Sequence, residues 1–262
     1  MRRLEANQIK GIIKEAQVGE SLGQLSRRFG LSKTTVYYHA RRFCRKMGRF
    51  DERHLTEWEK GYLVGFFVGD GCFVFRPKHW SYITKFVLNA RTEKAIADFL
   101  AMTLSKAGIN PWTTIEGNRL NLRASSKSLQ VFLKNYAGYE LEMRKLRKRL
   151  FLNEILRQEK EFGFGVLAGL IDSDGYVGYA GYKRRSLAVM ITTASRVLAD
   201  LMVQMVKELG MDATIITQYR SRFGTSYFCF HVRVLTRSAI MNVNNMKSLK
   251  LQQVFNGGFK TN

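Results

Sequence analysis

The sequence predicts an α+β protein made of two similar halves that follow a small all-helical module. Three observations support this fold class. An 11-residue stretch that begins at Gly61 recurs at Gly165, 104 positions later. After each copy, the hydrophobic period changes from helical to strand-like and then repeats the same order of elements. The first 50 residues instead carry three helical patterns. We therefore expect two pseudo-symmetric αββαββα-like repeats behind a helical N-terminal domain.

The repeated stretch is an apolar run with small residues every fourth position. Glycine inside a helix costs about 1 kcal/mol relative to alanine, so such a stripe needs a compensating reason. Small residues four apart lie on one helix face, where they let two backbones approach closely. We therefore expect the two copies to pack against each other along these aligned pairs: Gly61 with Gly165, Gly65 with Gly169, and Gly69 with Ser173.

Each copy ends in an Asp-Gly pair, with Asp70 aligned to Asp174. If the two helices pack together, both carboxylates emerge side by side near the pseudo-two-fold axis. Two such carboxylates repel each other unless they are protonated or bridged by a cation. Oxygen ligands of this kind suit Mg²⁺. The alternative is that Asp-Gly only closes each helix with a turn, which explains a single copy better than two copies in register.

The second copy, Leu167–Gly175, resembles the motif that names the LAGLIDADG homing endonucleases, with serine at position 173 instead of alanine. The first copy, Leu63–Gly71, is a looser version that keeps both glycines and the last acid. The resemblance covers residues 61 to 262. It implies that the two αββαββα repeats form a DNA-binding saddle, with the motif helices at their interface.

The resemblance also implies catalytic roles. In this family the last acid of each motif binds the catalytic metal, which assigns Asp70 and Asp174 to Mg²⁺ or Mn²⁺. The carbonyl groups of Gly69 and Ser173, which precede the acids, are expected to contribute as metal ligands. Asp172 aligns with Val68 and is not expected to be catalytic.

A lysine near the end of each repeat is a further expectation from the family. Lys250 follows the last predicted helix of the second half, and Lys148 stands at the corresponding place in the first half. The resemblance implies that both lysines reach the active site, although the residues around them align poorly.

The composition points to a polyanionic partner. The 262 residues include 43 Lys and Arg against 21 acids, a net charge of +22. Such an excess favours nucleic acid first and an anionic membrane second. The longest apolar run, Phe162–Ile171, is too short to span a bilayer, and no signal-peptide core follows Met1. Three scattered cysteines indicate free thiols in an intracellular reducing compartment, either cytoplasm or nucleoid, or an organelle.

Residues 1–48 are expected to form a helix-turn-helix DNA-binding domain, joined by a linker at 49–60. Twelve basic residues stand against three acids in residues 1–50. Gly30 can end one helix and Ser32 can cap the next. The segment Glu20–Tyr38 resembles the helix-turn-helix of resolvases and small regulators. The alternative is a solvated basic bundle. The reading helix would present these residues to a major groove: Lys33, Thr34, Thr35, Tyr37, Tyr38 and Arg41.

The repeats themselves are expected at 61–139 and 161–262, with an inter-repeat linker helix over 140–160. Strand patterns cover residues 72–76, 82–91, 112–115 and 119–124 in the first repeat, and 176–182, 187–193, 213–219 and 226–235 in the second. Helical patterns cover 92–107 and 125–136, and then 195–209 and 237–243.

Strand residues alternate between an apolar face and a polar, basic face. The polar face suits contact with the grooves and phosphates of DNA, although a solvated sheet face would look similar. The candidate DNA contacts in the two repeats are Arg76, Lys78, Lys85, Arg119, Asn121, Arg123, Lys183, Arg184, Arg185, Arg220, Arg222, His231 and Arg233.

Together the residues and the resemblance imply a monomeric, intron-encoded endonuclease that cuts both strands of a long DNA site with a divalent metal. Two alternatives use the same scaffold: a non-cleaving DNA-binding regulator and an RNA maturase that binds intron RNA. Both aligned acids argue against the regulator. A helix-turn-helix favours duplex DNA, because the major groove of A-form RNA does not admit a helix.

Overall fold

The computed structural model of the chain describes residues 4–18, 22–40, 50–76, 81–142, 145–180, 186–222 and 225–256. The chain divides into two compact units, residues 1–49 and 50–262. Among the described residues, no helix is both long and apolar enough to cross a membrane.

The described part of the N-terminal unit contains the three expected helices: α1 (Ala6–Val18), α2 (Leu22–Phe29) and α3 (Lys33–Ala40). Ile12, Leu25 and Val36 contribute one side chain from each helix to a small, fully buried core. The Ser32 hydroxyl accepts the N–H of Thr35 at 3.1 Å and so caps α3, as expected. That this unit reads DNA remains a prediction.

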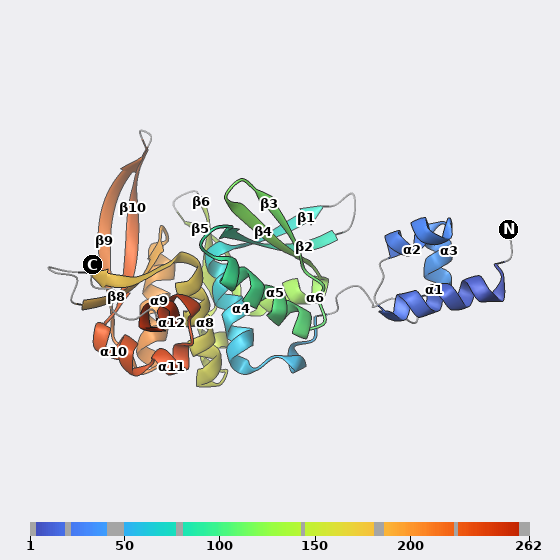
Figure 1. Ribbon diagram of the computed structural model, residues 1–262. Coiled ribbons are helices and arrows are strands. Elements are labelled where there is room, and N and C mark those ends of the chain that lie inside the picture. The colour runs from blue at the N-terminus through green and yellow to red at the C-terminus, as the bar shows by residue number, and fades with distance from the viewer. Residues whose placement is uncertain are drawn as a thin grey trace. The chain divides into compact units, whose positions relative to one another are not determined.

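The larger unit is built around two long helices, α4 (Glu57–Asp70) and α8 (Lys160–Asp174), which carry the two motif copies. Each helix leads directly into a four-stranded antiparallel sheet, and Figure 1 shows the two sheets on either side of the helix pair. A capping box opens α4, because Thr56 and Glu59 exchange side chain to backbone hydrogen bonds.

The first sheet has the order β1-β2-β4-β3 and the second has the order β7-β8-β10-β9, so the two repeats share one topology. The strands are β1 (Gly71–Arg76), β2 (Ser81–Asn89), β3 (Trp112–Glu116) and β4 (Arg119–Ser125), then β7 (Gly175–Ala180), β8 (Ser186–Thr193), β9 (Ala213–Arg222) and β10 (Thr225–Val234). The helices of the repeats are α5 (Lys94–Lys106) and α6 (Lys127–Tyr136), then α9 (Arg196–Glu208) and α10 (Thr236–Met241).

Local signals in corresponding helices also match. The glycines after α5 and α9, Gly108 and Gly210, both adopt positive φ values, +84° and +82°. Only glycine adopts this conformation without strain, so both helices stop at the same place. The expected internal repeat is therefore confirmed in topology and in helix termination.

The segment between the repeats corrects the sequence prediction. Instead of a linker helix over 140–160, strands β5 (Ala137–Glu142) and β6 (Lys145–Leu150) pair antiparallel, and only the short α7 (Leu152–Leu156) is helical before α8. Two further helices that were not predicted follow α10: α11 (Val243–Met246) and α12 (Leu249–Asn256).

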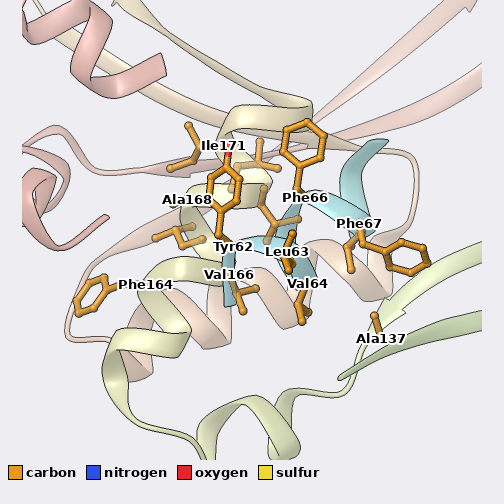
Figure 2. Close-up of a cluster of buried hydrophobic side chains, with 14 of the residues drawn as sticks. Tyr62, Leu63, Val64, Phe66, Phe67, Ala137, Phe164, Val166, Ala168 and Ile171 are labelled. Carbon is orange, nitrogen blue, oxygen red and sulfur yellow. The ribbon is translucent and has the colours of Figure 1, made fainter. Parts of the chain in front are cut away.

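The core of the larger unit lies at the contact of α4 with α8. Tyr62, Phe66, Val166 and Ile171 are fully buried there. Figure 2 shows these side chains filling the space around the two crossing backbones. Residues 61–68 of α4 and 162–173 of α8 are all buried, so neither segment has an exposed polar face. This pattern is typical of helices at the centre of a domain.

The small residues bring the two backbones together as expected. A Cβ atom added to Gly65 would lie 2.0 Å from the carbonyl oxygen of Val166, and one added to Gly169 would lie 2.3 Å from that of Tyr62. Gly61 and Gly165 are equally close to the opposite backbone. These distances leave no room for a methyl group.

This packing gives the first prediction. Gly65→Ala should lower the free energy of unfolding by about 3 kcal/mol, because the backbones must separate to admit the methyl group. The matched control is Gly163→Ala in α8, where the added Cβ would meet only the flexible end of Leu209, at 2.8 Å. Chemical denaturation should show a large loss for Gly65→Ala and little change for Gly163→Ala. Equal effects would contradict the close-packing account.

Candidate active site

The two motif acids lie at the ends of the packed helices. Asp70 is the last residue of α4, and Asp174 is the last residue of α8. At this end the helices still approach closely, since a Cβ on Gly69 would stand 3.3 Å from the Oδ2 atom of Asp174. The structure therefore brings the two acids together at the junction between the repeats, as the sequence predicts.

The two predicted lysines occupy corresponding places beside the acids. The Nζ atom of Lys148, on β6, donates to the carbonyl oxygens of Phe67, at 3.1 Å, and Gly69. The Nζ atom of Lys250, on α12, donates to the carbonyl oxygens of Ser173, at 3.0 Å, and Gly175, at 3.1 Å. Each cation thus satisfies carbonyl groups at the C-terminal end of a motif helix, where the helix dipole favours positive charge.

The acids carry an electrostatic cost in the absence of a cation. Desolvation, followed by the negative charges of Asp174 and Glu93, raises the pKa of Asp70 to about 7, although Lys148 and Lys250 oppose the shift. Surrounding protein atoms also desolvate Asp174 and raise its pKa, even though part of its surface reaches solvent. Two such close acids titrate as a pair. The site therefore favours either a shared proton or a bound cation.

Glu93 is a third acid at this site that the sequence analysis missed. It precedes α5, and its side chain accepts the backbone N–H of Asn89 at 2.7 Å. Its Oε1 atom lies 3.6 Å from the Nζ atom of Lys250. Together with Asp70, Asn118 and Arg119 it lines an open hollow of about 520 Å³. Ser195 takes the corresponding place before α9, so this acid has no counterpart in the second repeat.

Asp172 has a structural role, in agreement with the expectation that it is not catalytic. It is fully buried and accepts hydrogen bonds from the Tyr62 and Ser248 hydroxyl groups, at 3.0 and 2.6 Å. It also accepts the backbone N–H groups of Leu249 and Lys250, both at 2.9 Å, which open α12. Asp172 thereby fixes the start of the helix that carries Lys250.

The donor set fits a divalent ion that also binds substrate oxygens. Within the described residues, no three His, Cys, Asp or Glu side chains converge as a complete metal cage. Mg²⁺ commonly binds through one or two carboxylates, with waters and substrate phosphates completing the shell. The raised pKa of Asp70 and Asp174 indicates carboxylate charge that the two lysines do not fully compensate. Asp70 and Asp174 are therefore suitable ligands. The Gly69 and Ser173 carbonyl oxygens already accept hydrogen bonds from Lys148 and Lys250, and each could bind an ion through its second lone pair.

The strand register assigns most predicted DNA contacts to the outer face of each sheet, opposite the core. Lys85 pairs with Arg123 on this face of the first sheet. Arg233 pairs with Thr214 and carries an Nε atom that is buried without a protein partner. Arg119 and Arg220 are exposed.

Asn121 and His231 differ from the other predicted contacts because they are 2% and 7% exposed. Both His231 ring nitrogens are occupied, Nδ1 by the Thr192 hydroxyl at 2.9 Å and Nε2 by Gln218 Oε1 at 3.0 Å. Alternation along the strand placed His231 on the correct face, but it did not reveal the neighbours that cover it. Direct groove contact by these two side chains is therefore not available in this structure.

The remaining predicted contacts divide into two groups. In α3, Tyr37 and Tyr38 are exposed, as are Lys33 and Thr34, while Thr35 is half-buried. The others cannot be placed: Arg41, Lys78, Lys183, Arg184 and Arg185 lie outside the described residues, and the side chains of Arg76 and Arg222 are not described.

Comparison with known proteins supports the resemblance. Residues 161–250 match the family model of the LAGLIDADG-like domain. No curated protein sequence matches the chain. The second half of the chain therefore contains a LAGLIDADG-like domain.

Solved structures of homing endonucleases match the larger part of the chain. A structure of mesophilic variants of the homing endonuclease I-DmoI aligns with 74% of this chain and with 98% of its own chain, at 17% identity and a TM-score of 0.51. The structure of I-DmoI in complex with DNA and Mn aligns with 73% of this chain and with 97% of its own chain, at 17% identity and a TM-score of 0.51. I-WcaI bound to its DNA recognition sequence covers 74% and 82%, with 14% identity and a TM-score of 0.50. The fold of the two-repeat unit is that of the LAGLIDADG homing endonucleases.

The raised pKa of Asp70 gives the second prediction. In metal-free buffer, the folded carboxyl group, with a pKa of about 7, keeps its proton over a range where an unfolded one with a pKa of 3.8 has lost it. Stability from this group is therefore complete below pH 4 and is lost as the pH rises through 7. Asp70→Asn should stabilise the metal-free protein at pH 8 by roughly 2 kcal/mol and have little effect near pH 4.

Thermal unfolding in EDTA across this pH range would measure the effect. The matched control is Asp98→Asn, because Asp98 is exposed on α5 and away from the site. A stabilisation by Asp70→Asn that is the same at every pH would contradict the assignment.

Proposed function

We propose that this protein is a site-specific endonuclease that hydrolyses one phosphodiester bond in each strand of duplex DNA with a divalent metal ion. The observation that carries the proposal is the repeated arrangement at the ends of α4 and α8, where Lys148 and Lys250 bind the carbonyl groups just before Asp70 and Asp174. The charges of both lysines act on both acids. Two such centres about an internal pseudo-two-fold axis suit the two strands of a duplex. That I-DmoI and I-WcaI bind DNA on the same fold supports this reading.

In this proposal the acids bind the metal ion and the lysines stabilise negative charge on the phosphate. Asp70 and Asp174, with the carbonyl groups of Gly69 and Ser173, would hold Mg²⁺ or Mn²⁺. Such an ion supplies charge neutralisation at the scissile phosphate and activation of the attacking water. The lysine ammonium groups stand beside the acids, where their charge stabilises the negative charge that develops on the phosphate in the transition state. Burial lowers the pKa of Lys148, while the charges of Asp174 and Asp70 oppose this shift and favour its protonated form.

The outer sheet faces supply the binding surface in this proposal. Lys85, Arg119 and Arg123 extend it on the first repeat, and Arg220 and Arg233 do so on the second. Arginine can pair bidentately with a phosphate or with guanine, so these side chains suit both positioning and base contact.

The third prediction tests the chemistry. With Mg²⁺ or Mn²⁺, the wild-type protein should make double-strand cuts in a randomised duplex library that includes intron-flank sequences. Asp70→Asn and Asp174→Asn should each lower cleavage of at least one strand by about 10²-fold or more, because each removes a carboxylate that would hold the metal ion at the reacting phosphate. The double variant should cut neither strand. Denaturing electrophoresis of end-labelled duplex separates nicks from double-strand cuts.

Controls separate this activity from the alternatives. Asp98→Asn should cut at the wild-type rate, because this acid lies outside the site. Tight duplex binding by the wild-type protein without cleavage under either metal would support a DNA-binding regulator. Stronger binding to intron RNA than to duplex DNA would support an RNA maturase. Either result would overturn the proposed endonuclease.

We further propose that the N-terminal unit adds DNA contacts without chemistry. Lys33, Tyr37 and Tyr38 present exposed charged and aromatic side chains on α3. Such a helix suits a major groove. This role would explain the concentration of positive charge in the first 50 residues, where twelve basic residues stand against three acids.

The fourth prediction follows from that role. Removing residues 1–48 should weaken duplex binding so that it persists only at lower salt. The slope of log K against log salt should fall by about 0.9 for each phosphate that the shortened protein no longer neutralises. Fluorescence anisotropy with a labelled duplex measures both quantities. Unchanged affinity and slope would show that this unit makes no DNA contact.

A further inference from the structure

The strand pair β5–β6, which replaces the expected linker helix, has two distinct faces. In its antiparallel register Tyr139 lies opposite Lys148, and Leu141 lies opposite Leu146. These two pairs are separated by one position on each strand, so their side chains project from the same face. The other face carries Glu140 opposite Arg147, Glu142 opposite Lys145, and Arg149.

Both faces are anchored to the larger unit. On the first face, Lys148 reaches the carbonyl oxygens of Phe67 and Gly69, and the Tyr139 ring packs against Phe73 with centroids 6.4 Å apart. On the other face, Glu142 accepts the backbone N–H of Arg196, which opens α9, at 3.0 Å. The strand pair is therefore tied to the first repeat by one face and to the second repeat by the other, and Figure 1 shows it between the two sheets.

Leu141 and Leu146 form an apolar pair that no part of the described chain covers. They are 75% and 68% exposed although they face each other across the two strands. They lie two residues from Lys148, which corresponds to about 7 Å along a strand. The exposed leucines therefore stand close to this lysine, on the same face that reaches the motif acids.

The charge around the pair indicates the chemistry of its partner. On the face of the leucines the basic residue is Lys148, whereas Lys145 and Arg147 project from the opposite face, across from Glu142 and Glu140. The acids of β5 are already engaged, since Glu140 pairs with Arg149 at 3.0 Å and Glu142 binds the N-terminus of α9. An exposed apolar pair beside Lys148, on a strand pair whose basic residues outnumber its acids, is complementary to DNA, whose anionic backbone encloses stacked, apolar bases.

The position of the acids indicates which groove would meet the pair. Asp70 and Asp174 emerge together from crossing helices, so they can approach phosphates of both strands only where the strands are close. The minor groove of B-DNA is about 6 Å wide and the major groove about 12 Å. Apolar side chains that enter a minor groove can separate two stacked base pairs and kink the duplex.

We propose that Leu141 and Leu146 form a wedge that inserts between base pairs from the minor groove at the centre of the bound duplex. The inference rests on the proposed function, because it needs duplex DNA across the acids. Unstacking is unfavourable, and burial of the two leucine side chains between the bases would offset it. The wedge would bend the central step so that both scissile phosphates approach their acids. Anchoring at both faces suits a wedge, because a mobile strand pair would move aside instead of separating the stacked bases.

The experiment uses the full-length protein in EDTA, so that binding occurs without cleavage. The probe is a duplex recovered from the cleavage library, with 2-aminopurine placed in turn at each central position. Because 2-aminopurine fluorescence rises when the base is unstacked, wild-type binding should raise it several-fold at one central step. The variant Leu141→Ala/Leu146→Ala should lose this rise. Leu141→Met/Leu146→Met should retain it, because methionine is also an apolar wedge.

A mismatch supplies a second readout that a purely structural role would not change. A mismatched central step is already partly unstacked, so the wild-type protein should bind it about 10-fold more tightly than the paired step. The alanine double variant should bind both equally. The matched control is Met102→Ala, which removes an apolar side chain that is 58% exposed on α5. It should behave as the wild type does in both assays.

Three results would overturn the wedge. The first is duplex binding by the wild-type protein without a fluorescence rise at any central position, which would leave the proposed function intact. The second is a DNA-free dimer in sedimentation that the alanine double variant converts to a monomer, since the leucines would then meet a second copy. The third is an absence of duplex binding by the wild-type protein, which would overturn the proposed function as well.

Discussion

The close contact of α4 with α8 is the constraint on which the rest of the larger unit depends. Because glycine backbones meet there without side chains, the two helices cross near enough to end side by side. Each helix then passes directly into the first strand of its own sheet, Gly71 into β1 and Gly175 into β7. This single packing contact therefore sets the position of both acids and the spacing of both sheets. It also explains why the motif is so apolar, since residues 61–68 of α4 and 162–173 of α8 are all buried.

The same contact concentrates charge that the fold must tolerate. Asp70 and Asp174 share a desolvated junction, and Glu93 adds a third negative charge. Lys148 and Lys250 offset part of this repulsion while they satisfy the last carbonyl groups of the helices. A site that is costly without a cation gains affinity for one, because metal binding removes the repulsion that the folded chain otherwise carries. The packing of α4 against α8 stabilises the fold enough to tolerate this repulsion between the acids.

Sequence reasoning succeeded where periodicity and repetition carry the signal, and it failed where tertiary contacts decide. The motif helices and both sheets could be predicted, because each follows from a pattern that occurs twice. The two lysines were expected from the resemblance to the family, not from the repeat itself. The strand pair β5–β6 could not be predicted, because leucines at 141, 146 and 150 among basic residues also fit a helix. There the contacts of Lys148 and Glu142 override local propensity. The burial of His231 likewise depends on Thr192 and Gln218, which lie on other strands.

The two repeats are not equivalent at the site, and the residues that differ between them are those that contact Lys250. Asp172 fixes the start of α12 and so positions Lys250, whereas its counterpart in α4 is the apolar Val68. Glu93 lies within 3.6 Å of Lys250, whereas Ser195 stands at the corresponding place before α9. Lys148 is held instead by the strand pair that joins the repeats. Since each lysine is positioned by different partners, the two halves of the site are not related by exact symmetry. The acids thus follow the internal repeat, whereas the contacts that hold the lysines beside them do not.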